Sequence, residues 1–205
     1  HKGATRYQLT YGAIIDHVPD GGKVLDLGCG TGHFLYWLSN QPGIVPVGVD
    51  SCSNHIQLVQ QKLPDIEAVC QDGLAYLKEH PETFSGIFCF DVLEHVPEED
   101  ECLEWIEAAW YALKPAGFFL CRVPNAANLT SSYSRYMDMT HKRIFTRTSL
   151  IQLLTAGGLN KCRVVPIRAA HFMGQVRLII EYLLHKWLFR ICGRGLENIF
   201  TSNIC

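Results

Sequence analysis

Short apolar runs alternate with longer segments of helical periodicity along most of this chain. The apolar runs end at glycine, proline or acidic residues, and they predict strands at 23–27, 46–49, 67–70, 86–90, 117–123 and 161–167, with a last strand near 199–205. Between them, apolar side chains recur every three or four positions, which predicts helices at 6–17, 32–40, 53–62, 73–78, 99–113, 147–156 and 175–191. Strands that alternate with helices form a parallel sheet covered on both faces. We therefore predict an α/β fold with a doubly wound, mostly parallel sheet of seven strands.

The 205 residues contain no internal repeat and no low-complexity linker, so we expect one domain over residues 1–205. Hydrophobic residues make up 48% and charged residues 19%, which is ordinary for a globular protein. A formal net charge of −2 indicates no concentrated basic surface for a phosphate backbone. Nucleic acid is therefore not an expected partner, and a small or amphiphilic substrate is favoured.

Nine cysteines are scattered along the chain, and none of them forms a CxxC pair. Their odd number and irregular spacing favour mostly buried thiols in a reducing compartment over a set of disulfides. The chain has no uninterrupted run of about 18 apolar residues, and we expect neither a membrane span nor a secretory leader. A cytoplasmic location is the expectation.

The segment VLDLGCGTG at 24–32 joins the first predicted strand to the next helix and contains Gly28, Gly30 and Gly32. Glycine lets a backbone turn sharply and approach a ligand closely. The nicotinamide dinucleotide pattern GxGxxG would need glycine at the position of His33, so hydride transfer is disfavoured. Asp26 ends the strand, where its carboxylate suits the ammonium of a methionine moiety and would be awkward beside a pyrophosphate.

Two further acids, Asp50 and Asp72, follow the next two predicted strands. Asp50 can accept hydrogen bonds from both hydroxyls of a ribose. Asp72 could accept one from the exocyclic amine of adenine, or it could cap the helix that follows. Because the carboxyl ends of parallel strands meet at one edge, where ligands of open α/β sheets bind, the three acids and the glycine loop predict one shared site.

These segments, together with FDVLEHV and LKPAGFFLCRVPN, resemble the class I S-adenosylmethionine-dependent methyltransferases over residues 20–160. The resemblance implies a Rossmann-like fold, S-adenosylmethionine as methyl donor and S-adenosylhomocysteine as product. It implies that the three loop glycines flank the methionine end, that Asp50 holds the ribose and that Asp72 faces the adenine. The residues expected to bind the cofactor are Asp26, Gly28, Cys29, Gly30, Gly32, Asp50, Ser51, Asp72, Gly73 and Asp91. The acceptor stays open, because this family uses one frame for many substrates.

Asp91, Glu94 and His95 follow the fourth predicted strand at the mouth of the expected cleft. Methyl transfer from a sulfonium is an in-line displacement that depends mostly on positioning, with effective molarities of roughly 10⁵ M or more. A base contributes when the acceptor must lose a proton, and His95 suits that role for a hydroxyl or a phenol. The alternative is that His95 caps or braces the following helix.

The acid-x-x-Glu-His pattern of Asp91, Glu94 and His95 resembles that of ubiquinone-pathway O-methyltransferases, where it has been associated with a divalent cation. Mg²⁺ held by these three side chains is therefore one alternative. Two carboxylates beside one histidine make no closed site, so we expect hydrogen bonding without a metal.

Residues 124–146 are long, polar and rich in tyrosine and arginine, and we expect them to form a lid over the acceptor. In this lid, DMTHKRIFT at 138–146 resembles a THxRxFT-like segment of methyltransferases associated with sugar, cell-surface polysaccharide or lipid-linked acceptors. His141 is therefore a second candidate base, with loop bracing as its alternative role. Tyr133, Tyr136 and Arg143 are candidates for the wall of the acceptor pocket.

The last predicted helix lies in a helical insertion at 173–194. Arg177, Glu181 and His185 recur every four residues as a polar stripe, which leaves a wide apolar face that includes Trp187. The charges argue against a membrane span. The helix could pack on its own domain, form a homodimer contact, or attach weakly to the surface of an anionic membrane.

The expected function is therefore methyl transfer, at an oxygen, to a small-molecule, saccharide or lipid-linked acceptor. The alternative is a catalytically silent, methyltransferase-like protein that keeps the cofactor fold and acts as a binding or regulatory partner. The intact glycine and acid positions favour the enzyme.

Overall fold

The computed structural model describes residues 2–128, 130–165, 172–191 and 203–204. Its sheet has the strand order β3-β2-β1-β4-β5-β6. Five strands are parallel to one another: β1 (Gly22–Leu27), β2 (Ile44–Asp50), β3 (Glu67–Cys70), β4 (Phe84–Phe90) and β5 (Leu113–Pro124). The two-residue strand β6 (Asn203–Ile204) pairs antiparallel with the end of β5. The predicted α/β fold with a mostly parallel sheet is confirmed.

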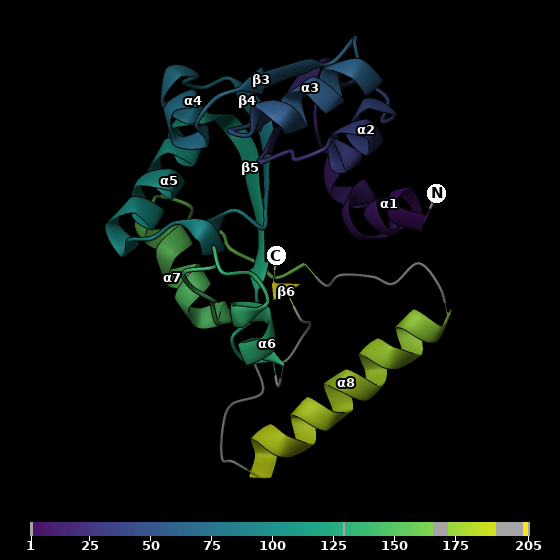
Figure 1. Cartoon of the computed structure of the whole chain (residues 1–205), viewed down its shortest axis with the longest axis vertical. Helices are drawn as coiled ribbons and strands as arrows, with labels where there is room; N and C mark the ends of the chain where they lie inside the picture. The colour runs from purple at the N-terminus through teal and green to yellow at the C-terminus, as the bar shows by residue number, and fades with distance from the viewer. Residues whose placement is uncertain (1, 129, 166–171, 192–202, 205) are drawn as a thin grey trace.

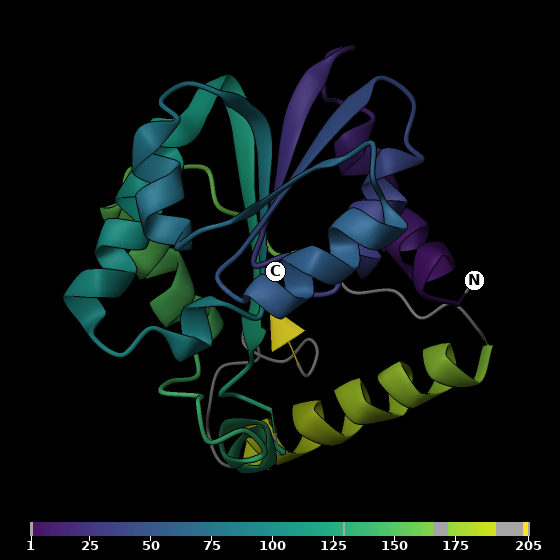
Figure 2. The same cartoon turned by 45° about the horizontal axis from the view of Figure 1, so that its top comes forward.

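Helices cover both faces of the sheet (Figure 1), which stands between two helix layers (Figure 2). One layer contains α1 (Lys2–Ile15), α2 (His33–Ser39) and α3 (Ser53–Lys62). The other contains α4 (Gly73–Glu79), α5 (Glu99–Ala112) and α7 (Arg147–Ala156). Three elements complete the described chain: the 3-10 turn η1 (Leu93–His95) and the helices α6 (Ser131–Tyr136) and α8 (Phe172–Ile191).

The burial pattern of β1 explains this layering. Leu25 and Leu27 are fully buried in the cluster that includes Trp105 of α5, whereas Val24 packs in the cluster of Tyr11 and other aromatic side chains on the opposite face. Successive side chains of a strand point to opposite faces, so a strand covered on both sides must be apolar nearly throughout. The strand order reverses between β1 and β4, and a ligand of such a sheet binds at this switch point.

The predicted number of seven strands is wrong for the described residues, which form six. The predicted strand at 161–167 is irregular chain over residues 161–165, and its last two residues lie outside the described part. A cavity of about 740 Å³ lies between this segment and β5 and is lined by residues of both. The strand predicted near 199–205 is reduced to Asn203–Ile204, and its other residues are not described.

Helix α6 lies inside the segment that the sequence predicts as an irregular lid. None of its six residues is buried, so no apolar periodicity marks it in the sequence. Helix α8 is present as predicted and begins three residues earlier, at Phe172. Among the described helices, none combines the length and the apolar character that crossing a membrane requires. The seven described cysteines are free thiols.

Candidate active site

The glycine loop is fixed to the end of β2 by backbone hydrogen bonds. The backbone N–H groups of Gly28 and Cys29 both donate to the carbonyl of Val49, at 2.8 and 3.0 Å. The N–H of Gly30 donates to Oδ2 of Asp50 at 2.8 Å. The other oxygen of Asp50, Oδ1, accepts from the N–H of Cys52 at 2.9 Å and lies 3.2 Å from Nδ1 of His55. Asp50, predicted to hold a ribose, therefore also braces the loop in front of it.

Gly30 leaves open space in front of this loop. Its φ is 51°, in the left-handed region that favours glycine, and a Cβ added there would meet no heavy atom within 4 Å. Gly73 differs, because a Cβ there would lie 2.6 Å from the ring of Trp105, so packing against α5 explains the absence of a side chain. The space in front of Gly30 is where a ligand can approach the backbone.

Asp26 contributes a buried carboxyl at the end of β1. Its side chain is 2% exposed, and Oδ2 has no hydrogen-bond partner among the described residues. Burial is the main cause that raises the pKa of Asp26 from 3.8 to about 7, while the positive charge of Arg122 and a hydrogen bond from the Leu35 backbone oppose the shift. A buried carboxyl oxygen without a hydrogen-bond partner among the described residues fits the ammonium of an amino-acid moiety.

Asp72 and Asp91 already have protein partners at the same edge. Oδ1 of Asp72 accepts from the N–H of Ala75 at 2.9 Å, so Asp72 caps α4, which is the alternative role that the sequence indicates. Asp91 is ion-paired to Arg122 of β5, whose Nε and Nη2 donate to its two carboxylate oxygens. The guanidinium of Arg122 also lies 4.6 Å from the centre of the Phe90 ring. Cofactor contacts of Asp72, Asp91 and Ser51 stay predictions.

The two candidate bases lie next to each other. His95 ends η1 and His141 belongs to the lid, and their ring centroids are 4.8 Å apart in an edge-to-face arrangement. The backbone N–H groups of Lys142 and Arg143 donate to the carbonyl of Glu94, at 2.7 and 3.3 Å. The lid segment is thus docked directly on the segment that follows β4.

Arg143, predicted at the acceptor wall, strengthens this docking instead. Its Nε and Nη2 donate to the carbonyls of Val96 and Pro97, at 3.0 and 2.6 Å. The other predicted wall residues, Tyr133 and Tyr136 of α6, have 70% and 77% exposed side chains. Both tyrosines are therefore open to solvent.

The hydrogen bonds of the two histidines fix their neutral tautomers. Oγ1 of Thr140 donates its proton to Oδ1 of Asp138 at 2.6 Å, so it can only accept at its 2.9 Å contact with Nδ1 of His95. Nδ1 of His141 lies 2.8 Å from the carbonyl of Ser134, which also only accepts. In its neutral form, each imidazole thus carries its proton on Nδ1 and has a lone pair on Nε2.

Glu94 and Asp138 surround this pair with carboxyl groups in different states. Burial is the largest cause that raises the pKa of Glu94 to about 8, and Oε2 of this 1% exposed side chain has no hydrogen-bond partner among the described residues. Asp138 is fully exposed, and hydrogen bonds from the side chain and backbone of Thr140 lower the pKa of its carboxyl. Near neutral pH, Glu94 is mostly a neutral acid, and Asp138 is an anion.

The side chains that the structure gathers as possible metal ligands differ from those suggested by the sequence. Glu94, His95 and His141 each offer one ligand atom within 4.8 Å of the others, whereas Asp91 is not part of this group. A second group of the same kind is Asp50, Cys52 and His55. The set of Asp91, Glu94 and His95 that the sequence suggests is therefore not gathered.

Several residues of this edge are not singled out by the sequence analysis. Arg122 is hidden in an apolar strand pattern, and its pairing with Asp91 follows from the register Phe90↔Arg122 of two neighbouring strands. Tyr7 of α1 is half-buried, and burial raises the pKa of its hydroxyl, with Arg122, Asp26 and Asp91 among the charged groups that act on it. Tyr7 thus lies close enough to this edge for its charged groups to affect the pKa of the hydroxyl. No local sequence pattern reveals this proximity.

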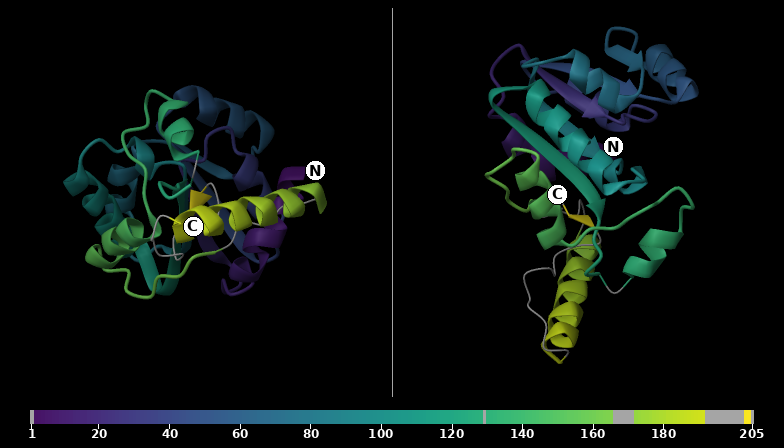
Figure 3. Two further views of the ribbon diagram at one scale, coloured as in Figure 1. Left: turned by 90° about the horizontal axis from the view of Figure 1, so that it is seen from below. Right: turned by 90° about the vertical axis from the view of Figure 1, so that its left-hand side faces the viewer.

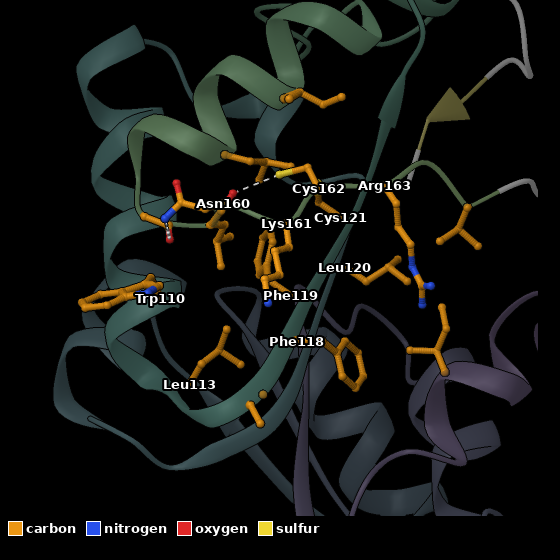
Figure 4. A pocket seen from close by; sticks show the side chains of 18 of the residues that line it. Trp110, Leu113, Phe118, Phe119, Leu120, Cys121, Asn160, Lys161, Cys162 and Arg163 are labelled. Atoms are coloured by element: carbon orange, nitrogen blue, oxygen red, sulfur yellow. Dashed lines mark hydrogen bonds between the residues drawn. The ribbon is translucent and has the colours of Figure 1, made fainter.

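The cavity beside β5 is separate from this edge. Figure 4 shows Phe118, Phe119 and Cys121 on the strand side of this cavity and Lys161 to Arg163 on the segment that runs past it. None of the predicted site residues lines it. The cavity therefore belongs to the outer edge of the sheet and not to the candidate active site.

Comparisons with known proteins agree with this geometry. Residues 6–164 match the family model described as "Methyltransferase domain". A ubiquinone biosynthesis O-methyltransferase of Pseudomonas entomophila is 33% identical over 101 residues, which are 47% of this chain and 42% of that protein. A phosphoethanolamine N-methyltransferase of Plasmodium falciparum is 24% identical over 178 residues, 82% of this chain and 64% of that protein. The chain spans about half the length of the first curated relatives it matches.

Solved structures show the same fold. A SAM-dependent methyltransferase from Archaeoglobus fulgidus superposes with a TM-score of 0.68 at 22% identity, covering 97% of this chain and 91% of that one. An S-adenosylmethionine-dependent methyltransferase from Clostridium acetobutylicum gives 0.65 at 17% identity, with 81% and 84% covered. At these identities the likeness concerns the fold alone. Because the family model spans well over half of the 205 residues, the chain belongs to the methyltransferase domain family, within the class I S-adenosylmethionine-dependent methyltransferases.

Proposed function

We propose that this protein transfers a methyl group from S-adenosylmethionine to an oxygen of a small-molecule acceptor, which includes saccharide and lipid-linked compounds. One observation carries this proposal: His95 and His141, from two distant segments, meet at the carboxyl edge of the sheet. Both histidines direct Nδ1 into hydrogen bonds and keep a lone pair on Nε2, which is the state that a general base needs.

Bound S-adenosylmethionine supplies a methyl group activated by its positive sulfur. Four features of the chain fit its parts. Asp26 offers a buried carboxyl oxygen to the ammonium, and the space in front of Gly30 admits the methionine end. Each carboxylate oxygen of Asp50 has one or two contacts with protein donors. Its remaining lone pairs can accept hydrogen bonds from the ribose hydroxyls. Asp72, as the cap of α4, faces the adenine end.

The acceptor hydroxyl loses its proton to Nε2 of His95 or His141. When Nε2 of His95 takes a proton, the imidazolium keeps its Nδ1–H on Oγ1 of Thr140, which in turn donates to the carboxylate of Asp138. The low pKa of the Asp138 carboxyl keeps a negative charge available at the end of this chain of hydrogen bonds. Thr140 and Asp138 act through His95 and are positioning residues.

Oxygen as the methylated atom and a saccharide or lipid-linked acceptor are inferences from chemistry and from relatives. A base is useful for a hydroxyl, which must be deprotonated, and the relative from Pseudomonas entomophila is named an O-methyltransferase. The lid segment 138–146 resembles that of methyltransferases that act on saccharide or lipid-linked acceptors. The relative from Plasmodium falciparum is named an N-methyltransferase, so the acceptor screen must include amines.

The test combines calorimetry of S-adenosylmethionine binding with a radiolabelled methyl-transfer screen. The acceptor panel contains phenols, quinol precursors, sugar nucleotides, lipid-linked saccharides and amines. We expect transfer to a hydroxyl compound, with kcat lowered about 10²–10⁴-fold in His95→Gln or His141→Gln and cofactor affinity nearly unchanged. Cofactor binding without transfer to any compound would favour the regulatory alternative. Wild-type turnover in both variants would leave proximity as the mechanism.

A further inference from the structure

Helix α8 turns two residues of its polar stripe, Glu181 and His185, toward the protein, whereas Arg177 is exposed. His185 is 4% exposed, and its Nδ1 lies 2.7 Å from the carbonyl of Glu181, to which it donates. The side chain of Glu181 accepts a hydrogen bond from Nδ2 of Asn128 in the lid, at 2.7 Å from Oε1. The stripe residue Glu181 therefore attaches the helix to the lid.

The opposite side of α8 is apolar and open to solvent. At about 3.6 residues per turn, Ile179, Ile180, Leu183 and Trp187 lie together away from Glu181 and His185. Their side chains are 55% to 60% exposed. Phe172, Met173, Leu184 and Ile191 extend the same apolar surface, and all are exposed. We call these eight residues the outer face of α8.

The views of the molecule place α8 at its periphery. In Figure 2 the helix lies below the sheet, on the side where β5 ends, and Figure 3 shows it along the outside of the molecule. No other described element covers its outer side in these views. Contiguous exposed apolar surface of this extent marks an interaction surface on a soluble domain.

The charges of α8 favour one class of partner. Its basic residues are Arg177, Lys186 and Arg190, and its one acidic residue, Glu181, is turned inward and hydrogen-bonded. Arg177 and Lys186 flank the outer face on its two sides, where long basic side chains can reach anionic headgroups. An isologous dimer through this face would bring the same basic residues together without acidic partners, which is unfavourable.

We propose that the outer face of α8 binds the surface of an anionic lipid bilayer. The helix lies in the plane of the membrane, with Trp187 and the aliphatic side chains about 5–10 Å into the headgroup and acyl boundary. Arg177, Lys186 and Arg190 contact the phosphates. This proposal concerns a surface outside the methyl-transfer site and stands independently of the proposed reaction.

The first test is flotation of the intact chain with phosphatidylcholine vesicles that do or do not contain phosphatidylglycerol. We expect flotation with the anionic vesicles at low salt, a loss at high salt, and little binding to phosphatidylcholine alone. Trp187→Glu and Leu183→Glu should each weaken binding by roughly tenfold or more, because a charge then replaces inserted apolar surface. Arg177→Glu combined with Lys186→Glu should remove the preference for anionic lipid.

Tyr36→Glu is the matched control. Tyr36 lies on α2 and is 56% exposed, close to the 60% of Trp187, so the same change is made at an equally exposed aromatic residue elsewhere. It should bind vesicles as wild type does. Circular dichroism of each variant separates loss of fold from loss of binding.

Three results would overturn the proposal. One is a wild-type chain that stays unbound to anionic vesicles at low salt. Another is a chain that light scattering shows to be a dimer in solution, converted to a monomer by Trp187→Glu, because the outer face would then be a protein–protein interface. The third is equal binding of the Trp187→Glu and Tyr36→Glu variants, which would exclude α8 as the contact.

Discussion

Oγ1 of Thr140 lies 2.9 Å from Nδ1 of His95, although the two residues are 45 positions apart in the sequence. The same oxygen donates to Asp138, so the lid carries a two-step hydrogen-bonded chain to an imidazole that follows β4. In the neutral form of His95, this chain of hydrogen bonds places the proton on Nδ1 and leaves Nε2 with a lone pair.

Removing the Thr140 hydroxyl should change the tautomer of His95. Thr140→Val keeps the branched shape and deletes the acceptor, so the Nδ1–H form loses its partner, whereas Thr140→Ser keeps the hydroxyl. We expect a mixed tautomer population in Thr140→Val by long-range ¹H–¹⁵N NMR, and a wild-type spectrum in Thr140→Ser. Once an acceptor has been identified, kcat for its methylation should fall about tenfold or more in Thr140→Val, with KM little changed. Identical spectra in both variants would show that Thr140 does not set the tautomer.

Asp26 should link cofactor binding to proton release. Its carboxyl, with a pKa of about 7, is partly protonated at neutral pH, and an ammonium bound beside it favours the ionised form. Affinity for S-adenosylmethionine should therefore rise by up to about tenfold per pH unit below pH 7 and level off above it. Asp26→Asn should bind more weakly and lose this dependence. Calorimetry at several pH values measures this affinity. If the affinity depends on pH equally in wild type and Asp26→Asn, the ammonium binds elsewhere.

Glu94 should make the fold less stable as the pH rises. Its pKa is raised by burial from 4.5 to about 8, so the folded protein holds this proton more tightly than the unfolded chain. Its contribution is complete below pH 4.5 and is lost as the pH rises toward 8 and above. Replacement by glutamine removes this loss, which is on the order of 5 kcal/mol.

Urea unfolding from pH 5 to pH 9 compares wild type with Glu94→Gln. Asp26 titrates with the same sign, from 3.8 toward about 7, so both proteins are also measured on an Asp26→Asn background. The difference between wild type and variant should grow with pH. If the free energies of unfolding of wild type and Glu94→Gln differ by the same amount at every pH, ionisation of Glu94 does not destabilise the fold.

Divalent metals that favour imidazole should inhibit methyl transfer. Zn²⁺ or Ni²⁺ bound by Glu94, His95 and His141 would occupy the lone pairs that the proposed base uses. We expect a rate that is insensitive to EDTA and is inhibited by added Zn²⁺, with the inhibition weakened in His141→Gln. A rate abolished by EDTA and restored by Mg²⁺ would replace the metal-free mechanism with a metal-assisted one.

The meeting of the glycine loop and Asp50 at one edge of the sheet was predictable because it depends on local geometry. Gly28, Gly30 and Asp50 each follow the end of an apolar strand, and parallel neighbours bring those ends together whatever lies elsewhere. For Asp91, only the position follows from this local geometry. Its position at the edge follows from β4, but its pairing with Arg122 depends on the register of β4 against β5.

The acceptor side and the periphery depend on contacts between distant segments. The sequence singles out His95 and His141 separately, but their approach requires the docking of the lid on the Glu94 carbonyl. An apolar pattern at 161–167 does not reveal that a cavity separates part of this segment from β5. The repeat of Arg177, Glu181 and His185 predicts a stripe on α8 and leaves its direction open, because periodicity contains no information about which side meets the domain.

The hydrogen bond between Asn128 and Glu181 ties the lid to α8, and it makes these two parts of the molecule thermodynamically reciprocal. If a membrane restrains α8 and an acceptor orders the lid, the membrane would reduce the conformational freedom that Asn128 loses when the acceptor binds. Linkage then requires that the acceptor tighten lipid binding by the same factor by which lipid tightens acceptor binding. A single, partly buried hydrogen bond between a carboxylate and an amide would then let a membrane-bound chain hold an acceptor more firmly than the same chain in solution.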